Sequence, residues 1–140
     1  MKYTIIKEEL AFNGFLKINK AVISHEKFNG DFIKVSRECL ERGDSVAIVL
    51  FEKDTEKFLM TNQFRYPTIK EGYGWIDEIT AGSVKEEDVL EERVKKEVTE
   101  ELGYVLIEPL EFIFTFFVSP GGTSERIHLY YAEVNSTNKT

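Results

Sequence analysis

The chain has 140 residues and a formal net charge of −7, with 42% hydrophobic and 31% charged residues. This length and composition favour one folded domain with a sizeable core, and the negative charge argues against the basic surface that nucleic acids and anionic membranes require. No run approaches the roughly 18 apolar residues of a membrane span, and the single cysteine, Cys39, fits a reducing compartment, so we expect a cytoplasmic protein with neither nucleic-acid nor membrane partners.

Strand and turn signals fill the first part of the chain. Asn13-Gly14 and Asn29-Gly30 each separate two β-prone runs, and Asn-Gly in that position is a strong hairpin signal. The run SVAIVLFE at 45–52 is nearly all apolar, which predicts a strand buried on both faces. A polar turn at 52–55 follows, and KFLMTNQF at 57–64 is predicted to be the antiparallel partner of that strand.

A helix and two more strands are predicted in the second half. Asp88 and Glu91 have the spacing of a capping box, so the helix should run from about residue 89 to 102 and end at Gly103. The runs LEFIFTFFV and RIHLYYAEV, joined by SPGGTSE, then predict two strands and a loop.

Carboxylates crowd the apolar stripe of the predicted helix. At about 100° per residue, Val94 and Val98 belong to a stripe that faces the core, and Glu97 and Glu101 lie beside or within it, with Glu100 on the flank. Buried like charges one turn apart are costly unless a cation joins them, and Mg²⁺ or Mn²⁺ prefers such oxygen ligands. The alternative is that these residues are solvated or paired with the basic residues of the helix, and periodicity alone leaves both interpretations open.

The spacing of these residues resembles the Nudix box, G-x5-E-x7-R-E-U-x-E-E-x-G-U, where U is a bulky residue. The chain matches this pattern at Gly82, Glu97, Val98, Glu100, Glu101 and Gly103. It departs at two positions, since Asp88 replaces the usual Glu and Lys96 the usual Arg. The resemblance implies that these two residues pair with each other, and a Lys–Asp pair lacks the bidentate fork of arginine. We therefore expect weaker scaffolding of the helix.

Four flanking segments are similar to the ADP-ribose pyrophosphatase branch of Nudix hydrolases, which includes enzymes that act on GDP-mannose. They are RGDSVAIVLF at 42–51, QFRYP at 63–67, WIDEITAG at 75–82 and SPGGTSERIHLYYAEV at 119–134. The resemblance implies an α/β fold, the Nudix α/β/α sandwich with a mixed sheet preceded by N-terminal antiparallel strands. Residues 1–40 would form those strands, exchanged in a homodimer, and 41–140 the Nudix domain.

The resemblance also implies an enzyme, a Nudix pyrophosphohydrolase. It would use Mg²⁺, with Mn²⁺ as an alternative, to hydrolyse the diphosphate bond of a nucleoside diphosphate sugar into a nucleoside monophosphate and a sugar phosphate. ADP-ribose is the first expected substrate, and GDP-mannose or another nucleotide sugar is the alternative. A catalytically weak, nucleotide-binding Nudix module is the competing function.

Site residues follow from matching each motif position. The resemblance implies metal binding by Glu97, Glu100, Glu101 and the backbone carbonyl of Ala81, catalysis by those glutamates and Glu125, and substrate binding by Arg65, Glu78, Gly121 and Gly122. Two alternatives stay open: Arg65 in a structural ion pair with Glu78, and Glu125 paired with Arg126 or another basic residue at a strand end.

Two further expectations concern aromatic residues and the C-terminal part of the domain. The aromatic rings available either for stacking on a nucleobase or for the core are Phe28, Tyr66, Tyr73 and Trp75. In this branch the catalytic glutamate usually follows the strand that matches RIHLYYAEV, together with a closing strand and a helix. The sequence ends six residues after Val134, so we expect that part to be missing and the general base to be unidentified, with Glu125 or a water activated by metal alone as candidates.

Overall fold

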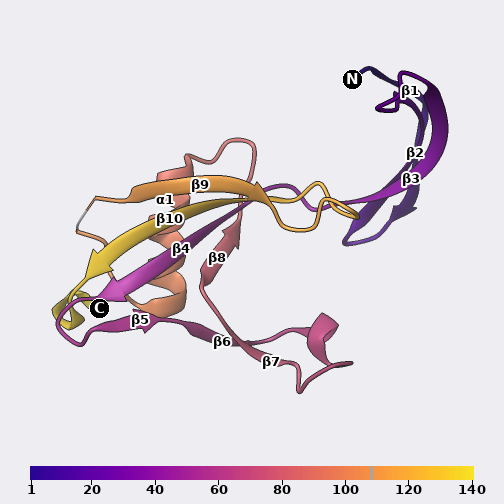
Figure 1. Ribbon diagram of the computed structural model, residues 1–140. Coiled ribbons are helices and arrows are strands. Elements are labelled where there is room, and N and C mark those ends of the chain that lie inside the picture. The colour runs from indigo at the N-terminus through magenta and orange to yellow at the C-terminus, as the bar shows by residue number, and fades with distance from the viewer. Residues whose placement is uncertain (108) are drawn as a thin grey trace. The chain divides into compact units, whose positions relative to one another are not determined.

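The computed structural model describes residues 1–107 and 109–140. These residues divide into two compact units. Unit 1 contains Met1–Gly43 and Phe117–Glu125, and unit 2 contains Asp44–Phe116 and Arg126–Thr140. Figure 1 labels the elements of both. The assignment of residues 1–40 to an arm exchanged in a dimer stays a prediction.

Unit 1 is built on a three-stranded antiparallel sheet. Its strands are β1 (Tyr3–Asn13), β2 (Lys17–Glu26) and β3 (Phe32–Glu41), in the order β1-β2-β3. Both predicted hairpins are confirmed, because the Asn-Gly pairs lie where the chain reverses. Gly30 has φ +87°, a left-handed conformation that glycine adopts without a steric penalty.

Unit 2 contains the mixed sheet, the main helix and a small hairpin. Its elements are β4 (Ser45–Glu52), β5 (Lys57–Leu59), β6 (Thr61–Phe64), a 3₁₀ turn (Tyr66–Thr68), β7 (Trp75–Glu78), β8 (Thr80–Ser83), α1 (Leu90–Glu97), a π-helical turn η2 (Val98–Leu102), β9 (Glu111–Phe117), β10 (Arg126–Val134) and a 3₁₀ turn (Ser136–Asn138).

The strand order of the sheet in unit 2 is β5-β4-β10-β9, with β8 also paired to β4. Strands β4 and β10 are parallel, whereas β5 and β8 run antiparallel to β4. The predicted fold class, a mixed sheet with a packed helix preceded by antiparallel strands, is confirmed (Figure 1). The run 57–64 was predicted to pair with β4 along its whole length, and this is wrong in its second half. Within this run Lys57–Leu59 pairs with β4, whereas Thr61–Phe64 pairs with β7.

The core of unit 2 lies between the sheet and α1. Val46, Ile48 and Leu50 of β4 are buried against Val94 and Val98 of the helical segment. The remaining buried members of this cluster are Tyr104, Tyr130, Ala132 and Val134. Burial of these apolar side chains fixes α1 against the sheet. The orientation of α1 in turn sets the positions of the glutamates on its last turns. No helix in the described part of the chain has the length and apolar character needed to cross a membrane.

The predicted capping box at the start of α1 is wrong. Val89 occupies the N-cap position without a side-chain hydrogen bond. The Asp88 carboxylate instead accepts a hydrogen bond of 2.8 Å from the backbone N–H of Lys85, and the backbone N–H of Asp88 donates back to the Lys85 carbonyl at 3.0 Å. Asp88 thus closes the turn before the helix, one residue too early to cap it. The predicted end is confirmed, since Gly103 has φ +70°.

Tyr104, directly after the helix, carries a polar contact into the core. Its hydroxyl donates to the carboxylate of Glu52 at the end of β4, and both side chains are buried. That hydrogen bond, together with burial, raises the pKa of Tyr104 to about 12. Thr55 and then Tyr104 donate to Glu52, and these bonds lower the pKa of its carboxyl.

The raised pKa of Tyr104 predicts that the stability of the fold decreases at alkaline pH. Because its pKa is about 12 in the folded protein and about 10 in an unfolded chain, folding favours the protonated form. The resulting stability is complete below pH 10 and is lost as pH rises toward 12. In thermal unfolding followed by circular dichroism, we expect Tyr104→Phe to unfold at a lower temperature than the parent at pH 8, with the difference shrinking above pH 10. Tyr3→Phe, at an exposed position, is the control, and a difference that does not vary with pH would contradict the expectation.

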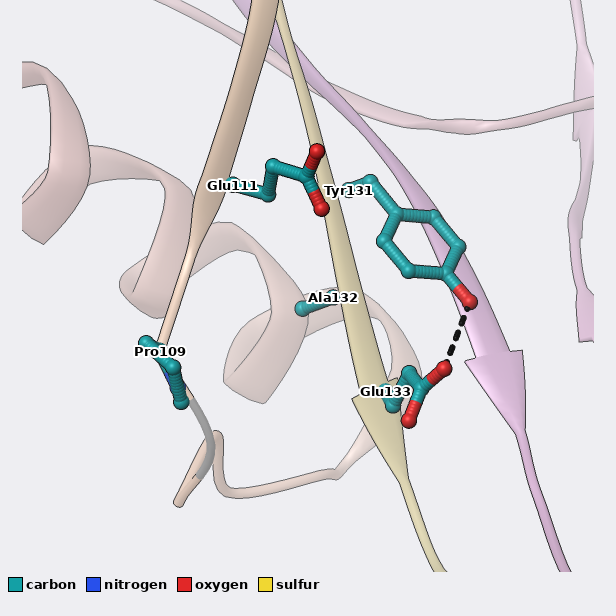
Figure 2. A pocket seen from close by; sticks show the side chains of 5 residues that line it. All are labelled: Pro109, Glu111, Tyr131, Ala132 and Glu133. Atoms are coloured by element: carbon teal, nitrogen blue, oxygen red, sulfur yellow. Dashed lines mark hydrogen bonds between the residues drawn. The ribbon is translucent and has the colours of Figure 1, made fainter.

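A pocket of about 200 Å³ lies on β9 and β10 (Figure 2). Its lining residues are Pro109, Glu111, Tyr131, Ala132 and Glu133. The Tyr131 hydroxyl donates to Glu133 at 3.0 Å, and Lys53 Nζ lies 3.4 Å from the same carboxylate. None of the residues assigned to the site from the sequence lines this pocket, and its two carboxylates do not favour a diphosphate.

Candidate functional site

The three glutamates of the box lie across the junction of α1 and the π-helical turn. Glu97 is the last residue of α1 and is 6% exposed, so its predicted place in the apolar stripe is confirmed. Glu100 and Glu101 lie in the π-helical turn and are exposed. A π-turn changes the rotation per residue, which explains why Glu101 does not share the burial that a regular helix predicts for it. Such turns are frequent at functional sites.

Gly82 makes room for the Glu97 side chain. A Cβ atom at residue 82 would lie 2.6 Å from Glu97 Cγ and closer still to the carboxylate. Only glycine accommodates this close approach. Gly82 lies in β8 opposite Val46 of β4, and Ala81 lies opposite Ala47. Strand β8 therefore brings the backbone of Gly82 against the buried carboxylate, with Ala81 next to it in the chain.

Glu97 forms an ion pair with Arg93, and the charge of Lys96 also acts on its carboxylate. Arg93, one turn earlier, forms an ion pair with Glu97 Oε1, but the contact lacks hydrogen-bond geometry, and Glu97 Oε1 and Arg93 Nε are both buried without a hydrogen-bond partner. Burial raises the pKa of Glu97, Arg93 opposes this shift, and Glu101 and Glu100 add to it. A buried carboxylate oxygen that lacks a hydrogen bond is costly even beside a cation, and a divalent cation bound to it would lower that cost.

The exposed glutamates have partners of their own. Lys96 Nζ lies 3.7 Å from Glu100, and Gln63 Nε2 donates to Glu101 Oε1 at 3.1 Å. The expected Lys96–Asp88 pair is wrong, because Lys96 faces Glu100 and Asp88 binds the Lys85 backbone. The pairing of helix glutamates with basic residues, left open by the sequence, is thus realised for Glu97 and Glu100.

The residues that are present fit a hard divalent cation. Within residues 1–107 and 109–140, no three His, Cys, Asp or Glu side chains converge as a ready-made metal cluster. However, the unsatisfied oxygen of Glu97, the glycine beside it and the carboxylates on the next turn together supply the oxygen ligands that Mg²⁺ prefers. Like-charged side chains spread apart unless a cation holds them together.

Arg65 follows β6 and is bound to Glu78 at the end of β7. Its Nε donates to Glu78 Oε1 at 2.9 Å, and its Nη2 donates to the same oxygen. The hydrogen bond to Glu78 is the main cause that raises the pKa of Arg65, and the charge of Glu101 contributes. The structural ion pair left open by the sequence is therefore present, and it lies close enough to Glu101 for their charges to interact.

The other predicted site residues belong to unit 1. Glu125 is mostly buried, with 12% of its side chain exposed, and lies 3.8 Å from Arg42. The suggested partner Arg126 instead binds Asp44. Gly121 and Gly122 line a pocket of about 350 Å³, in which no atom would obstruct a Cβ at either glycine. The other lining residues are Arg37, Glu38, Cys39, Pro120 and Thr123.

The four aromatic residues considered for stacking do not form part of the core in the described structure. Phe28, Tyr66, Tyr73 and Trp75 are all exposed, between 60% and 98%. Trp75 makes an edge contact with Phe64, with ring centroids 5.7 Å apart. Exposure leaves the faces of these rings accessible to a ligand or to another protein.

Of the two side chains that contact Glu97 and Glu101, the sequence offered Arg93 among the possible basic partners but gave no indication of Gln63. Arg93 stands four residues before Glu97, a helical spacing at which opposite charges meet. The alternative that pairs the helix glutamates with basic residues is therefore realised at Glu97. Gln63 precedes Arg65 by two residues, so in an extended chain the two side chains point to the same side. Its partner Glu101 is 38 residues away, and such pairing cannot be read from spacing.

Comparisons with known proteins show the family of this chain. A family model described as the NUDIX domain matches residues 41–140. GDP-mannose pyrophosphatase from Yersinia enterocolitica is 32% identical over 141 residues, covering 99% of this chain and 73% of that protein. ADP-ribose pyrophosphatase from Escherichia coli K12 is 31% identical over 137 residues, covering 95% of this chain and 64% of that protein.

A solved structure shows the same fold. The crystal structure of an ADP compounds hydrolase superposes with a TM-score of 0.73 at 18% sequence identity, covering 95% of this chain and 68% of that one. The match to the family model includes the glycine, the helix and all three glutamates described above. The chain belongs to the Nudix family and is a Nudix pyrophosphohydrolase.

Proposed function

We propose that the chain is a Mg²⁺-dependent hydrolase of the diphosphate bond in a nucleoside diphosphate sugar, with ADP-ribose as the first substrate to test. The products would be a nucleoside monophosphate and a sugar phosphate. The observation that carries this proposal is the buried carboxylate of Glu97, whose Oε1 pairs with Arg93 but has no hydrogen bond, held against Gly82 and followed by Glu100 and Glu101 on the next turn. Relatives named for nucleotide-sugar pyrophosphatase activity support the substrate class.

The proposed metal ligands are Glu97, Glu100, Glu101 and the backbone carbonyl of Ala81, with Mn²⁺ as an alternative to Mg²⁺. When bound, the ion would neutralise the charge of the diphosphate and lower the pKa of the attacking water. The burial of Glu97 fixes its carboxylate in one place, so the site does not have to order that side chain during the reaction.

The substrate contacts are proposed from the arginine and the glycine loop. A guanidinium has five N–H donors, and Glu78 accepts from two nitrogens of Arg65. Donors remain for a phosphate oxygen, and Glu78 holds the arginine in place for that contact. Gly121 and Gly122, which leave open space in their pocket, are proposed to admit the substrate, and Glu125 is proposed as the general base.

GDP-mannose is the second candidate substrate. The observation in its favour is that three relatives named GDP-mannose pyrophosphatase match 95–99% of this chain at 30–32% identity. We further propose that the chain acts in the cytoplasm as a homodimer. The exposed apolar residues of β1, among them Tyr3, Ile5 and Leu10, support a partner subunit at that sheet.

A substrate panel tests the proposal. Purified protein is incubated with Mg²⁺ and ADP-ribose, GDP-mannose or another nucleotide sugar, and AMP or GMP is separated by ion-exchange chromatography. We expect monophosphate release that requires Mg²⁺ and stops with EDTA. If calorimetry detects nucleotide binding while no monophosphate forms from any sugar, the chain is a binding module and the proposed activity is wrong.

A further inference from the structure

We propose that Gln63 is a positioning residue that holds the Glu101 carboxylate in the orientation needed to bind the metal; this inference rests on the proposed function. Gln63 lies in β6, outside the helix that carries the box. Its amide Nε2 donates to Glu101 Oε1 at 3.1 Å, across 38 residues of sequence. This hydrogen bond connects the β6–β7 hairpin to the π-helical turn.

Two polar side chains, Gln63 and Arg65, both interact with Glu101. Side chains two residues apart in an extended chain point to the same side, so Gln63 of β6 and Arg65, whose backbone directly after β6 is still extended, lie on one side. Gln63 bonds to Glu101, and the charge of Glu101 acts on Arg65. Asn62, directly before Gln63, lies on the opposite face and donates its own amide to Asp77, across the β6–β7 pair, at 2.7 Å. The printed partner of Asn62 is therefore a residue of β7 and not a glutamate of the helix.

Glu101 needs such a partner because of its position. It is exposed, and it shares its helical turn with Glu100 and its electrostatic field with Glu97. Repulsion between like charges favours side-chain rotamers that point away from the other carboxylates. A hydrogen bond from a rigid strand selects one orientation, and groups that orient metal ligands in this way commonly change metal affinity when they are removed.

The chemistry of the donor distinguishes Gln63 from Arg93. The guanidinium of Arg93 neutralises Glu97 and competes with a cation for the same carboxylate. The amide of Gln63 is neutral, so it orients Glu101 while leaving its negative charge available to the metal. It engages Oε1, and a carboxylate has a second oxygen with which to bind a cation.

Mn²⁺ binding tests the inference without measuring catalysis. Electron paramagnetic resonance of free Mn²⁺ gives the dissociation constant for the parent protein and four variants: Gln63→Leu, Gln63→Met, Asn62→Leu and Glu101→Gln. Leu and Met keep much of the side-chain volume of Gln without a donor. We expect about a 10-fold weaker Mn²⁺ affinity in both Gln63 variants, no change in Asn62→Leu, and the greatest loss in Glu101→Gln. The unfolding temperature of each metal-free variant is measured in parallel.

The outcomes separate the inference from the proposed function. If the parent binds Mn²⁺, Glu101→Gln loses it and both Gln63 variants keep the parent affinity, the role of Gln63 is wrong while the metal site stands. If Asn62→Leu weakens Mn²⁺ as much as Gln63→Leu does, the effect belongs to the hairpin as a whole and the inference is also wrong. If the parent protein does not bind Mn²⁺, both the metal site and the inference are overturned.

Discussion

Replacing Glu97 or Glu101 by glutamine is expected to lower Mg²⁺-dependent hydrolysis of ADP-ribose by at least about 100-fold. Each change removes a negative charge and one hard oxygen ligand while keeping the shape of the side chain, and direct ligands matter more than the outer contacts that are worth about 10- to 100-fold. The two variants should differ in the metal-free protein. Glu97 is buried and paired with Arg93, whereas Glu101 is exposed, so only Glu97→Gln should alter the unfolding temperature clearly.

The matched control for these variants is Glu92→Gln on the same helix. Glu92 is exposed and forms an ion pair of 2.7 Å with Lys95, a surface contact of the kind that contributes little to stability. Its activity should stay within about twofold of the parent, since exposed side chains away from a site have small effects. Full turnover in both Glu97→Gln and Glu101→Gln would remove the basis for assigning them as metal ligands.

The local patterns that predicted the fold correctly were those that depend on neighbouring residues. The Asn-Gly turns, the apolar run of β4 and the left-handed Gly103 each follow from a few adjacent side chains. The pairing of Thr61–Phe64 was missed because Met60 interrupts the strand and the chain then turns to β7. The alternation of β6 suits either partner, and tertiary contacts decide between them.

The site shows the same division between local and long-range information. The helical period placed Glu97 in the buried stripe correctly, because α1 is regular up to that residue. The same period did not predict the exposure of Glu101, because the helix widens into a π-turn there. No residue in this stretch indicates a π-turn from the sequence. The partner of Glu101 depends on where the β6–β7 hairpin lies, which requires the folded chain. Spacing thus identified the ligand types but not the contacts that orient them.

Gly82→Ala is expected to reduce Mg²⁺-dependent activity by about 100-fold while the protein stays folded. The added methyl group would overlap the Glu97 side chain, which is buried and cannot swing into solvent without leaving the core. The carboxylate must therefore shift, and a displacement of about 1 Å at a reacting centre can cost about 100-fold in rate. Overpacking of this kind typically destabilises a protein by about 1–3 kcal/mol, so a chain of ordinary stability should survive it.

Gly72→Ala provides the control for a glycine that has room. A Cβ there would meet only the Thr68 carbonyl oxygen at 3.4 Å, and Gly72 does not need a left-handed backbone. Activity, Mn²⁺ affinity and unfolding temperature are measured for both variants. A Gly82→Ala protein that binds Mn²⁺ like the parent would show that Glu97 can move without affecting the ion, and Glu97 would then serve only to pair with Arg93. We expect Gly82→Ala to lose Mn²⁺ affinity with its fold retained, and Gly72→Ala to keep it. This result would show that β8 shapes the metal site by leaving space beside the buried carboxylate.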